Sequence, residues 1–376
     1  MASKNIAKRP NGKWRARYRD ESGKEHSRHF DRKIDASRWL DEVTTSLVTG
    51  QYVAPNAGKV TFKAYAEQWR LNQVQHRPTT RAHMQTTLNR RVYPKLGDKP
   101  IGSISPEDIR NWLAWLQVGD DTMTPILKPL SVSTIRTAHG IVSGIFRSAV
   151  RDKRIASNPC EGTRLPKPER KLVVPPTPEI VQSLLDHCPA EYLAMLMLGA
   201  GAGMRNGEVL GLTRDRIDFM RRTVTVDRQL VSVQGQKPFL ASPKTPSSVR
   251  QVPLPQAVVE ALSEHVRRYE IGEKELLFTY SGEPISRQLW GHRIWRPLVA
   301  KTKVGELRFH DLRHYYASLL IRYGESVKTV QARLGHASAS ETLDTYSHLW
   351  PDSDDRTRDA IDAAFRQTEP AATATR

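Results

Sequence analysis

The chain has 376 residues, of which 38% are hydrophobic, and this length predicts two or three domains with packed cores. Its 58 lysines and arginines exceed its 40 acidic residues and give a formal net charge of +18, which favours a polyanionic partner because each neutralised phosphate releases counterions. Its two cysteines, Cys160 and Cys188, exclude a disulfide framework and a cysteine-rich zinc site and fit a reducing cytoplasm.

The start of the chain is basic and has no apolar run of the signal-peptide type. The longest near-apolar run, residues 192–204, contains three glycines and is too short to cross a bilayer, so it predicts a buried helix and no membrane partner. Charge alone leaves open the alternative of a basic protein with a solvated surface.

Residues 13–19 alternate in character with period two, as in a strand with one apolar face. The other face carries three arginines: Arg15, Arg17 and Arg19. A turn at residues 21–24 leads to a returning strand over 26–30, and a helix is predicted over 35–48. A small sheet backed by one helix, with a basic outer face, can lie in a DNA groove, whereas the alternative is a solvated basic hairpin.

A linker over residues 51–59 leads to a second region, 61–158, where apolar residues at helical spacing predict four or five helices. One of these helices starts at residues 77–80, with Thr79 or Thr80 as its N-cap. Six prolines between residues 158 and 178 then favour extended structure and mark the clearest domain boundary.

Residues 179–367 form the last predicted domain, and residues 368–376 look disordered. Its helices are predicted over 179–188, 190–202, 206–212, 255–268, 287–301, 311–323, 326–334 and 340–347. Residues 223–227 predict a short strand, and residues 239–254 predict a hairpin. Near the end, Ile361, Ala364 and Phe365 form a helical stripe that suits either docking on a neighbouring protomer or packing within the chain.

Several residues in this last domain could do chemistry. Arg205 and Glu208 are three apart where two predicted helices meet, so they can share one face, although a surface salt bridge would look the same. Lys244 lies in the predicted hairpin, from which a lysine can reach a phosphate or a base edge, although an ordinary turn lysine is the alternative.

The sequence His-Asp-Leu-Arg-His at residues 310–314 is more specific. Arg313 offers a planar fork that matches phosphate oxygens, and His310 can share protons near neutral pH. Asp311 is suited to cap the helix that follows. Metal ligation by His310 and His314 is the alternative, but no Glu or Cys accompanies them at zinc-site spacing.

Leu-Gly-His at residues 334–336 ends another predicted helix, and Gly335 suits a left-handed C-cap that would fix the exit of His336. Tyr346 follows ten residues after His336. Most tyrosines bury the ring and tie the hydroxyl to a partner, and Tyr315, Tyr316 and Tyr323 are expected to be of that kind.

Taken in order, these residues resemble the catalytic signature of tyrosine recombinases, which reads G-x-R-x-x-E, a hairpin Lys, H-x-x-R, L-G-H and a late Tyr. The matching residues are Arg205, Lys244, His310, Arg313, His336 and Tyr346, with Glu208 as a supporting residue. The resemblance covers nearly the whole chain. Residues 61–158 resemble the helical core-binding domain of that family, and residues 1–57 resemble the arm-type DNA-binding domain of phage and conjugative-element integrases.

The resemblance implies a multidomain, mainly α protein with small β elements. Its parts would be a small sheet-plus-helix domain over 1–57, a helical core-binding domain over 61–158, a proline-rich linker over 159–178 and an α+β catalytic domain over 179–367. DNA contacts would come from the first two of these domains, through Arg15, Arg17, Arg19, Arg77 and Thr79.

The implied reaction is a transesterification that integrates and excises a phage genome or mobile element. Tyr346 would attack the phosphodiester and form a 3′-phosphotyrosyl bond, with His310 as the acceptor of its proton. Arg205 and Arg313 would clamp the phosphate, Lys244 would protonate the departing 5′-oxygen, and His336 would donate a hydrogen bond. Because the bond energy is conserved, neither ATP, a metal ion nor another cofactor is required.

The resemblance also implies partners: double-stranded DNA with core and arm sites, and three further copies in a homotetramer. A directionality factor and a host DNA-bending protein are candidates, and the expected location is the cytoplasm of a bacterial host, at the nucleoid. A transposon integrase of the same family is the nearest alternative. A type IB topoisomerase shares this chemistry, but the arm-like N-terminal domain argues against it, and a chromosome-dimer recombinase would lack residues 1–57. A non-catalytic DNA-binding regulator would not need the six-residue set.

Overall fold

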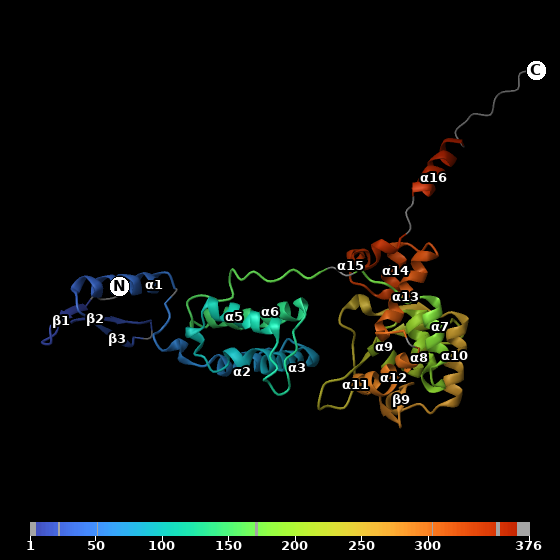
Figure 1. The fold of residues 1–376 in the computed structure, drawn as a ribbon, viewed down its shortest axis with the longest axis horizontal. Coiled ribbons are helices and arrows are strands. Elements are labelled where there is room, and N and C mark those ends of the chain that lie inside the picture. The colour runs from blue at the N-terminus through green and yellow to red at the C-terminus, as the bar shows by residue number, and fades with distance from the viewer. Residues whose placement is uncertain are drawn as a thin grey trace, which may run out of the picture. The chain divides into compact units, whose positions relative to one another are not determined.

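The structure is a computed structural model that describes residues 5–21, 23–50, 52–169, 172–302, 304–350 and 354–366. The chain divides into two compact units, residues 1–169 and 170–376, whose elements are drawn in Figure 1. Most elements are helices, and the strands form small sheets of two or three, which confirms the predicted mainly α fold with small β elements. The tail predicted over 368–376, Ser22 of the predicted turn and Gln51 of the predicted linker lie outside the described residues.

The first unit begins with a three-stranded antiparallel sheet backed by one helix. Its elements are β1 (Asn5–Lys8), β2 (Trp14–Arg19), β3 (Glu25–Phe30) and α1 (Lys33–Val48). Ala16 and Tyr18 of β2 are buried in one cluster with Ala36 and Leu40 of α1, which confirms the apolar face predicted for this strand. Tyr52, predicted as linker, belongs to the same core, and its hydroxyl lies 2.8 Å from that of Tyr18.

The remainder of the first unit is a helical bundle with its own core. Its α-helices are α2 (Phe62–Leu71), α3 (Pro78–Thr87), α4 (Tyr93–Leu96), α5 (Pro106–Val118) and α6 (Val132–Arg151). Helix α3 begins at Pro78 with Arg77 as its N-cap, so the prediction of Thr79 or Thr80 as N-cap is wrong. Proline presets the helical φ at the first position and holds the preceding residue extended, which starts the helix earlier.

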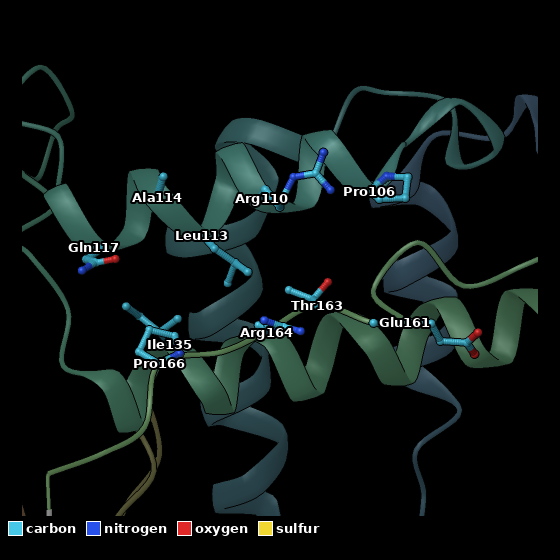
Figure 2. A pocket seen from close by; sticks show the side chains of 11 residues that line it. Pro106, Arg110, Leu113, Ala114, Gln117, Ile135, Glu161, Thr163, Arg164 and Pro166 are labelled. Atoms are coloured by element: carbon cyan, nitrogen blue, oxygen red, sulfur yellow. The ribbon is translucent and has the colours of Figure 1, made fainter.

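The residues just after α6 remain with this bundle although they were predicted to begin the linker. The side-chain amide of Asn158 donates to Ser143 Oγ (3.2 Å), and Cys160 is buried in the bundle core. A cavity of about 460 Å³ lies between α5, α6 and the segment that follows. Figure 2 shows its lining, which includes Leu113 and Ile135 with Arg110 and Arg164.

The second unit contains the helices predicted for residues 179–347 and one more at its end. They are α7 (Pro178–Asp186), α8 (Ala190–Ala202), α9 (Asn206–Leu210), α10 (Gln256–Arg268), α11 (Arg287–Leu289), α12 (Arg296–Thr302), α13 (Phe309–Arg322), α14 (Val327–Leu334), α15 (Ala339–Tyr346) and α16 (Asp354–Arg366). A π-helical turn over Trp290–Trp295 joins α11 and α12 into the single segment that was predicted. Helix α8 is buried along most of its length, as its apolar sequence predicted. Tyr323, the C-cap of α13, is 83% exposed, so the burial predicted for its ring is wrong. In the part of the chain that the structure describes, no helix is long and apolar enough to cross a membrane.

The strands of the second unit pair differently from the prediction. A three-stranded sheet contains β4 (Ile217–Asp218), β5 (Thr223–Val226) and β8 (Arg250–Pro253), and the two-stranded sheets pair β6 (Gln229–Val231) with β7 (Phe239–Ala241) and β9 (Thr279–Tyr280) with β10 (Glu283–Pro284). The hairpin predicted over 239–254 is therefore wrong, since β7 pairs with β6 and β8 pairs with β5. Pro243 and Pro246 lack the N–H that a ladder between β7 and β8 would need.

Candidate active site

Glu208 lies on α9 and is 3% exposed. Its carboxylate accepts the backbone N–H of Arg205 (2.9 Å) and the Arg205 guanidinium (Nη1 to Oε1, 2.9 Å). It also accepts both terminal nitrogens of Arg250, at 2.8 and 3.2 Å. Burial by itself would raise the pKa of Glu208, but the hydrogen bonds and charge of Arg250, together with Arg205, outweigh burial and lower the pKa to about 2. The guanidinium groups of Arg205 and Arg250 therefore share one buried carboxylate. The pair of Arg205 and Glu208 is thus not a surface salt bridge.

Arg250 is a buried member of this cluster that the sequence analysis did not select. Its Nε donates to the backbone carbonyl of Arg333 (2.8 Å) and its Nη1 to that of Ser248 (3.0 Å), besides the bonds to Glu208. The sequence signal for its burial was the alternation of residues along β8, which places Arg250 on the same buried face as Val252. A buried arginine on a strand needs an acidic partner, and Glu208 supplies it.

Glu208→Gln is expected to lower the free energy of unfolding by about 3 to 5 kcal/mol, because removal of one buried partner leaves Arg250 without its counter-charge. The urea midpoint of the variant, followed by circular dichroism, measures this loss. Glu264→Gln is the matched control, since Glu264 forms an exposed pair with Arg267 and no measurable change is expected. A Glu208→Gln midpoint equal to that of the parent protein would contradict the assignment.

Arg313 is held at the ends of two helices. Its side chain is 1% exposed, and Nη1 donates to the carbonyl of Gly203 (2.7 Å) while Nη2 donates to that of Leu334 (2.5 Å). Gly203 is the C-cap of α8 and Leu334 is the last residue of α14, so the cation lies where unpaired carbonyls and the helix dipoles are negative. Two helix ends thus fix a guanidinium inside the domain.

Glycine is required at both of these helix ends. Gly203 and Gly335 have φ of 62° and 65° in the left-handed region, which confirms the C-cap predicted for Gly335. A Cβ on Gly203 would lie 2.4 Å from the ring of Tyr316. The two caps therefore bring their carbonyls to Arg313 and set the exit of His336.

His310 lies near the start of α13, at the edge of the site. The helix begins at Phe309, and Asp311 accepts the backbone N–H of Arg308 (2.8 Å), so Asp311 caps the helix from its third residue. His310 is exposed, and its ring stands edge-on to that of His314, with 4.9 Å between centroids. Desolvation of the ring, followed by the charges of His314 and Arg313, lowers the pKa of His310 below its usual value.

His336 follows Gly335 and is 8% exposed. Its Nδ1 lies 2.9 Å from Oγ1 of Thr342, a fully buried residue of α15, and its ring is nearly parallel to that of Tyr346. Burial, followed by the charge of Arg313, lowers the pKa of His336 to about 4, so the imidazole is neutral at neutral pH. Thr342 was missed by the sequence analysis, although it lies one turn before Tyr346 and can orient the ring of His336.

Tyr346 is the last residue of α15 and is 1% exposed. Its hydroxyl oxygen lies 2.8 Å from Nδ1 of His314, and burial raises the pKa of Tyr346 to about 12. The resemblance implied that His310 accepts the proton of this hydroxyl, whereas in the structure the hydroxyl contacts His314, one helical turn farther along α13. Among the described residues, no group of three or more His, Cys, Asp or Glu side chains is placed to hold a metal ion.

Lys244 lies outside this buried cluster, in the segment that joins β7 to β8, and is exposed. The residues that follow it are fixed: Thr245 Oγ1 lies 2.9 Å from Ser248 Oγ, and the Ser248 carbonyl accepts Arg250. The structure thus gathers Arg205, Glu208, Arg313, His336 and Tyr346, with His310 at their edge, and anchors the loop of Lys244 to the same cluster through Arg250.

The residues predicted to contact DNA lie in the first unit. Arg15, Arg17 and Arg19 occupy the sheet face opposite α1, where Glu25 of β3 lies 3.4 Å from Arg15 Nη2 and 3.6 Å from Arg17 Nη1. Arg77 and Thr79 are exposed at the start of α3.

Comparison with known proteins gives consistent matches along the chain. Family models of the phage integrase family, the phage integrase N-terminal domain and the phage integrase central domain match residues 177–352, 5–49 and 62–165. The prophage phiRv2 integrase of Mycobacterium tuberculosis is 30% identical over 352 residues, which cover 90% of this chain and 89% of that protein.

Two solved structures share the fold. The Tn1549 transposon integrase in complex with circular intermediate DNA is 22% identical, with a TM-score of 0.65 over 81% of this chain and 100% of that chain. A lambda integrase tetramer bound to a Holliday junction is 18% identical, with a TM-score of 0.57 over 90% of this chain and 96% of that chain.

Proposed function

Because this chain belongs to the phage integrase family of tyrosine recombinases, we propose that it integrates and excises a mobile DNA element through a covalent bond to Tyr346. The observation that carries this proposal is the cluster at the end of α14. There the buried Arg313 donates to the carbonyl of Leu334, the neutral His336 lies parallel to the ring of Tyr346, and Arg205 donates to the carbonyl of Gly335 (3.5 Å).

Each group has a chemical role in this proposal. A phosphodiester repels nucleophiles, so Arg205 and Arg313 clamp its non-bridging oxygens and stabilise the charge that develops in the transition state. Glu208 fixes the position of Arg205, because its carboxylate accepts hydrogen bonds from both the backbone N–H and the guanidinium of that residue. His336 is neutral, and Thr342 orients its ring, so it donates one further hydrogen bond to the phosphate.

The covalent step replaces one phosphoester bond with another, so the bond energy is conserved. The Tyr346 oxygen attacks phosphorus and forms a 3′-phosphotyrosyl bond as its proton passes to His310, while Lys244 protonates the departing 5′-oxygen. The 5′-hydroxyl of a partner strand then attacks the phosphotyrosine and gives its proton to Lys244, and Tyr346 leaves with the proton that His310 returns. Neither ATP nor a metal ion takes part in this sequence of steps.

The domains divide the work on double-stranded DNA. In this proposal residues 1–57 bind arm sites, and residues 61–158 bind the core site together with the catalytic domain over 179–367. The proline-rich segment 159–178, whose first residues pack on the bundle, joins these two domains. The protein works as a homotetramer, as the tetramer of the similarly folded lambda integrase suggests. Ile361 of α16 is 52% exposed, which favours docking of that helix on a neighbouring protomer.

The remaining partners follow from the same proposal. A directionality factor and a host DNA-bending protein assist the tetramer, and the reaction takes place at the nucleoid in the cytoplasm of a bacterial host. The second candidate function is that of a transposon integrase, which the shared fold with the Tn1549 integrase favours. A non-catalytic regulator is disfavoured, because DNA binding alone needs no buried cluster around Tyr346.

Recombination in a defined mixture tests the function. A plasmid that carries the ends of the element is incubated with a second duplex that carries the host site, and junctions are amplified and sequenced. The proposal predicts junctions at one crossover site with no lost or added nucleotide. Binding of both DNAs without any recombinant junction, with the host bending protein present, would favour the regulator instead.

Replacement of Arg15, Arg17 and Arg19 by Ala is expected to remove protection of the arm site and to abolish integration, with core cleavage unchanged. The three residues share the sheet face opposite α1, and each lost phosphate contact should reduce the salt slope of arm binding by about 0.9. Footprinting and a salt titration measure both effects.

The control variant replaces Lys24 and Arg32, which are exposed elsewhere in the same domain. It should keep the arm footprint and the yield of integration. If the triple variant keeps its footprint and integrates at normal yield, residues 1–57 do not bind arm DNA through this face.

A further inference from the structure

Arg250 is a buried arginine whose hydrogen bonds reach three separate segments of the second unit. Its two terminal nitrogens donate to the carboxylate of Glu208 on α9, and its Nε donates to the carbonyl of Arg333 (2.8 Å) on α14. Nη1 also donates to the carbonyl of Ser248 (3.0 Å), just before β8. The side chain of Arg250 is 5% exposed, so these bonds form away from bulk water, where they are electrostatically stronger.

Glu208 joins Arg250 to Arg205, one of the two arginines proposed to clamp the phosphate. Its carboxylate accepts the guanidinium of Arg205 at 2.9 Å and that of Arg250 at 2.8 Å. Burial opposes ionisation of Glu208, but the bonds and charge of Arg250, together with Arg205, outweigh burial and lower the pKa of Glu208 to about 2. The carboxylate is therefore charged at neutral pH, and it fixes the position of Arg250 relative to Arg205.

The segment between β7 and β8, which carries Lys244, ends in a turn that is bound to the rest of the unit. Thr245 Oγ1 lies 2.9 Å from Ser248 Oγ, and the backbone N–H of Ser248 donates to the carbonyl of Thr245 (3.1 Å). Lys244 and Thr245 are exposed, whereas Ser248 is 6% exposed. A Cβ on Gly335 would lie 3.2 Å from Ser248 Cα, so the buried end of this turn packs against the end of α14.

We propose that Arg250 is a positioning residue for the general acid, which holds the segment of Lys244 in place through the buried end of its turn, Ser248. This inference rests on the proposed function, in which Lys244 protonates the departing 5′-oxygen. Because Arg250 bonds both Glu208 and Ser248, it sets the segment of the proton donor at a fixed place relative to the phosphate clamp. Without Arg250 the clamp would keep one partner of Glu208, but the segment of Lys244 would lose its anchor.

The step that depends on this placement is the departure of the 5′-oxygen. The bond from phosphorus to that oxygen breaks with its electron pair on the oxygen, which takes a proton from Lys244. A misplacement of about 1 Å can slow such a step by about 10² times. When sulfur replaces the bridging oxygen, the electron pair stays on a thiolate, which leaves without a proton. A misplaced Lys244 therefore slows cleavage of the oxygen substrate and spares the sulfur substrate.

The first test uses Arg250→Lys, which keeps the positive charge but lacks the planar fork that bonds three segments at once. In single-turnover cleavage of suicide DNA, this variant should cut the oxygen substrate about 10² times more slowly than the parent protein, and the sulfur substrate far less so. The ratio of the sulfur rate to the oxygen rate should therefore rise toward that of Lys244→Ala. The urea midpoint, followed by circular dichroism, shows whether the variant is folded.

Thr245→Val is a second variant, which leaves the buried arginine and its carboxylate partner intact. It removes the hydroxyl that contacts Ser248 and should raise the same ratio. Thr342→Val is the matched control, because it removes the hydroxyl that orients His336, and that histidine acts on the phosphate and not on the leaving oxygen. The control should slow cleavage of both substrates by the same factor.

An unchanged ratio in folded Arg250→Lys would overturn the proposal, because an equal loss on both substrates reports packing or the clamp alone. If Arg250→Lys does not fold, an unchanged ratio in Thr245→Val overturns it. Lys244→Ala on the same substrates separates the two levels. Equal impairment of Lys244→Ala removes the general acid from the proposed function, and this inference with it. If sulfur rescues Lys244→Ala but not Arg250→Lys, only this inference fails.

Discussion

Tyr346→Phe is expected to bind DNA normally and to form no covalent adduct. The substitution removes one oxygen, the atom proposed to attack phosphorus, and leaves the ring between His314 and His336. The cost to folding is about 1 kcal/mol, since His314 loses one hydrogen-bond partner. Gel shift measures binding, and a denaturing gel of protein incubated with suicide DNA measures the adduct.

Tyr316→Phe is the control for this experiment. Tyr316 is also buried, on α13, where its ring packs against Gly203, and its variant should form the adduct at normal yield. An adduct of normal yield from Tyr346→Phe would remove Tyr346 from the mechanism and turn attention to Tyr315 and Tyr316.

Lys244→Ala is expected to slow cleavage of ordinary DNA by about 10² to 10⁴ times, the usual contribution of a general acid. A substrate with sulfur at the bridging 5′ position should restore the rate, because a thiolate leaves without a proton. Rates on the two substrates, measured in single turnover, give the size of the rescue.

Lys237→Ala is the matched control, since Lys237 is an exposed lysine of the β6–β7 connection that pairs with Glu283. It should cleave both substrates at the parent rate. Equal impairment of Lys244→Ala on the oxygen and sulfur substrates would mean that Lys244 positions DNA and donates no proton.

Local patterns were sufficient for the helices of this protein. The long apolar run of α8 and the glycine at the end of α14 are signals within a short stretch of sequence. The position of α8 and the C-cap at Gly335 could therefore be predicted from the sequence. Strand partners are not recorded locally. Residues 239–241 and 250–253 have the right alternation, yet each pairs with a strand earlier in the chain.

The same limit applies to the site. Motif spacing identified Arg205, Arg313 and Tyr346 but not the contacts among them. His310 and His314 lie on one face of α13, and only the position of α15 decides which of them meets Tyr346. Arg250 is 42 positions away from Glu208 in sequence, so its role appeared only when β8 was placed beside α9.

The most direct test of the central claim is the identity of the residue bound to DNA. The full-length protein is trapped on suicide DNA, digested with trypsin and nuclease, and the nucleotide-bearing peptide is sequenced by mass spectrometry. The account predicts a single peptide in which Tyr346 carries a 3′-phosphate linkage. A nucleotide on Tyr315, Tyr316 or any other residue, or a linkage through the 5′-phosphate, would contradict it.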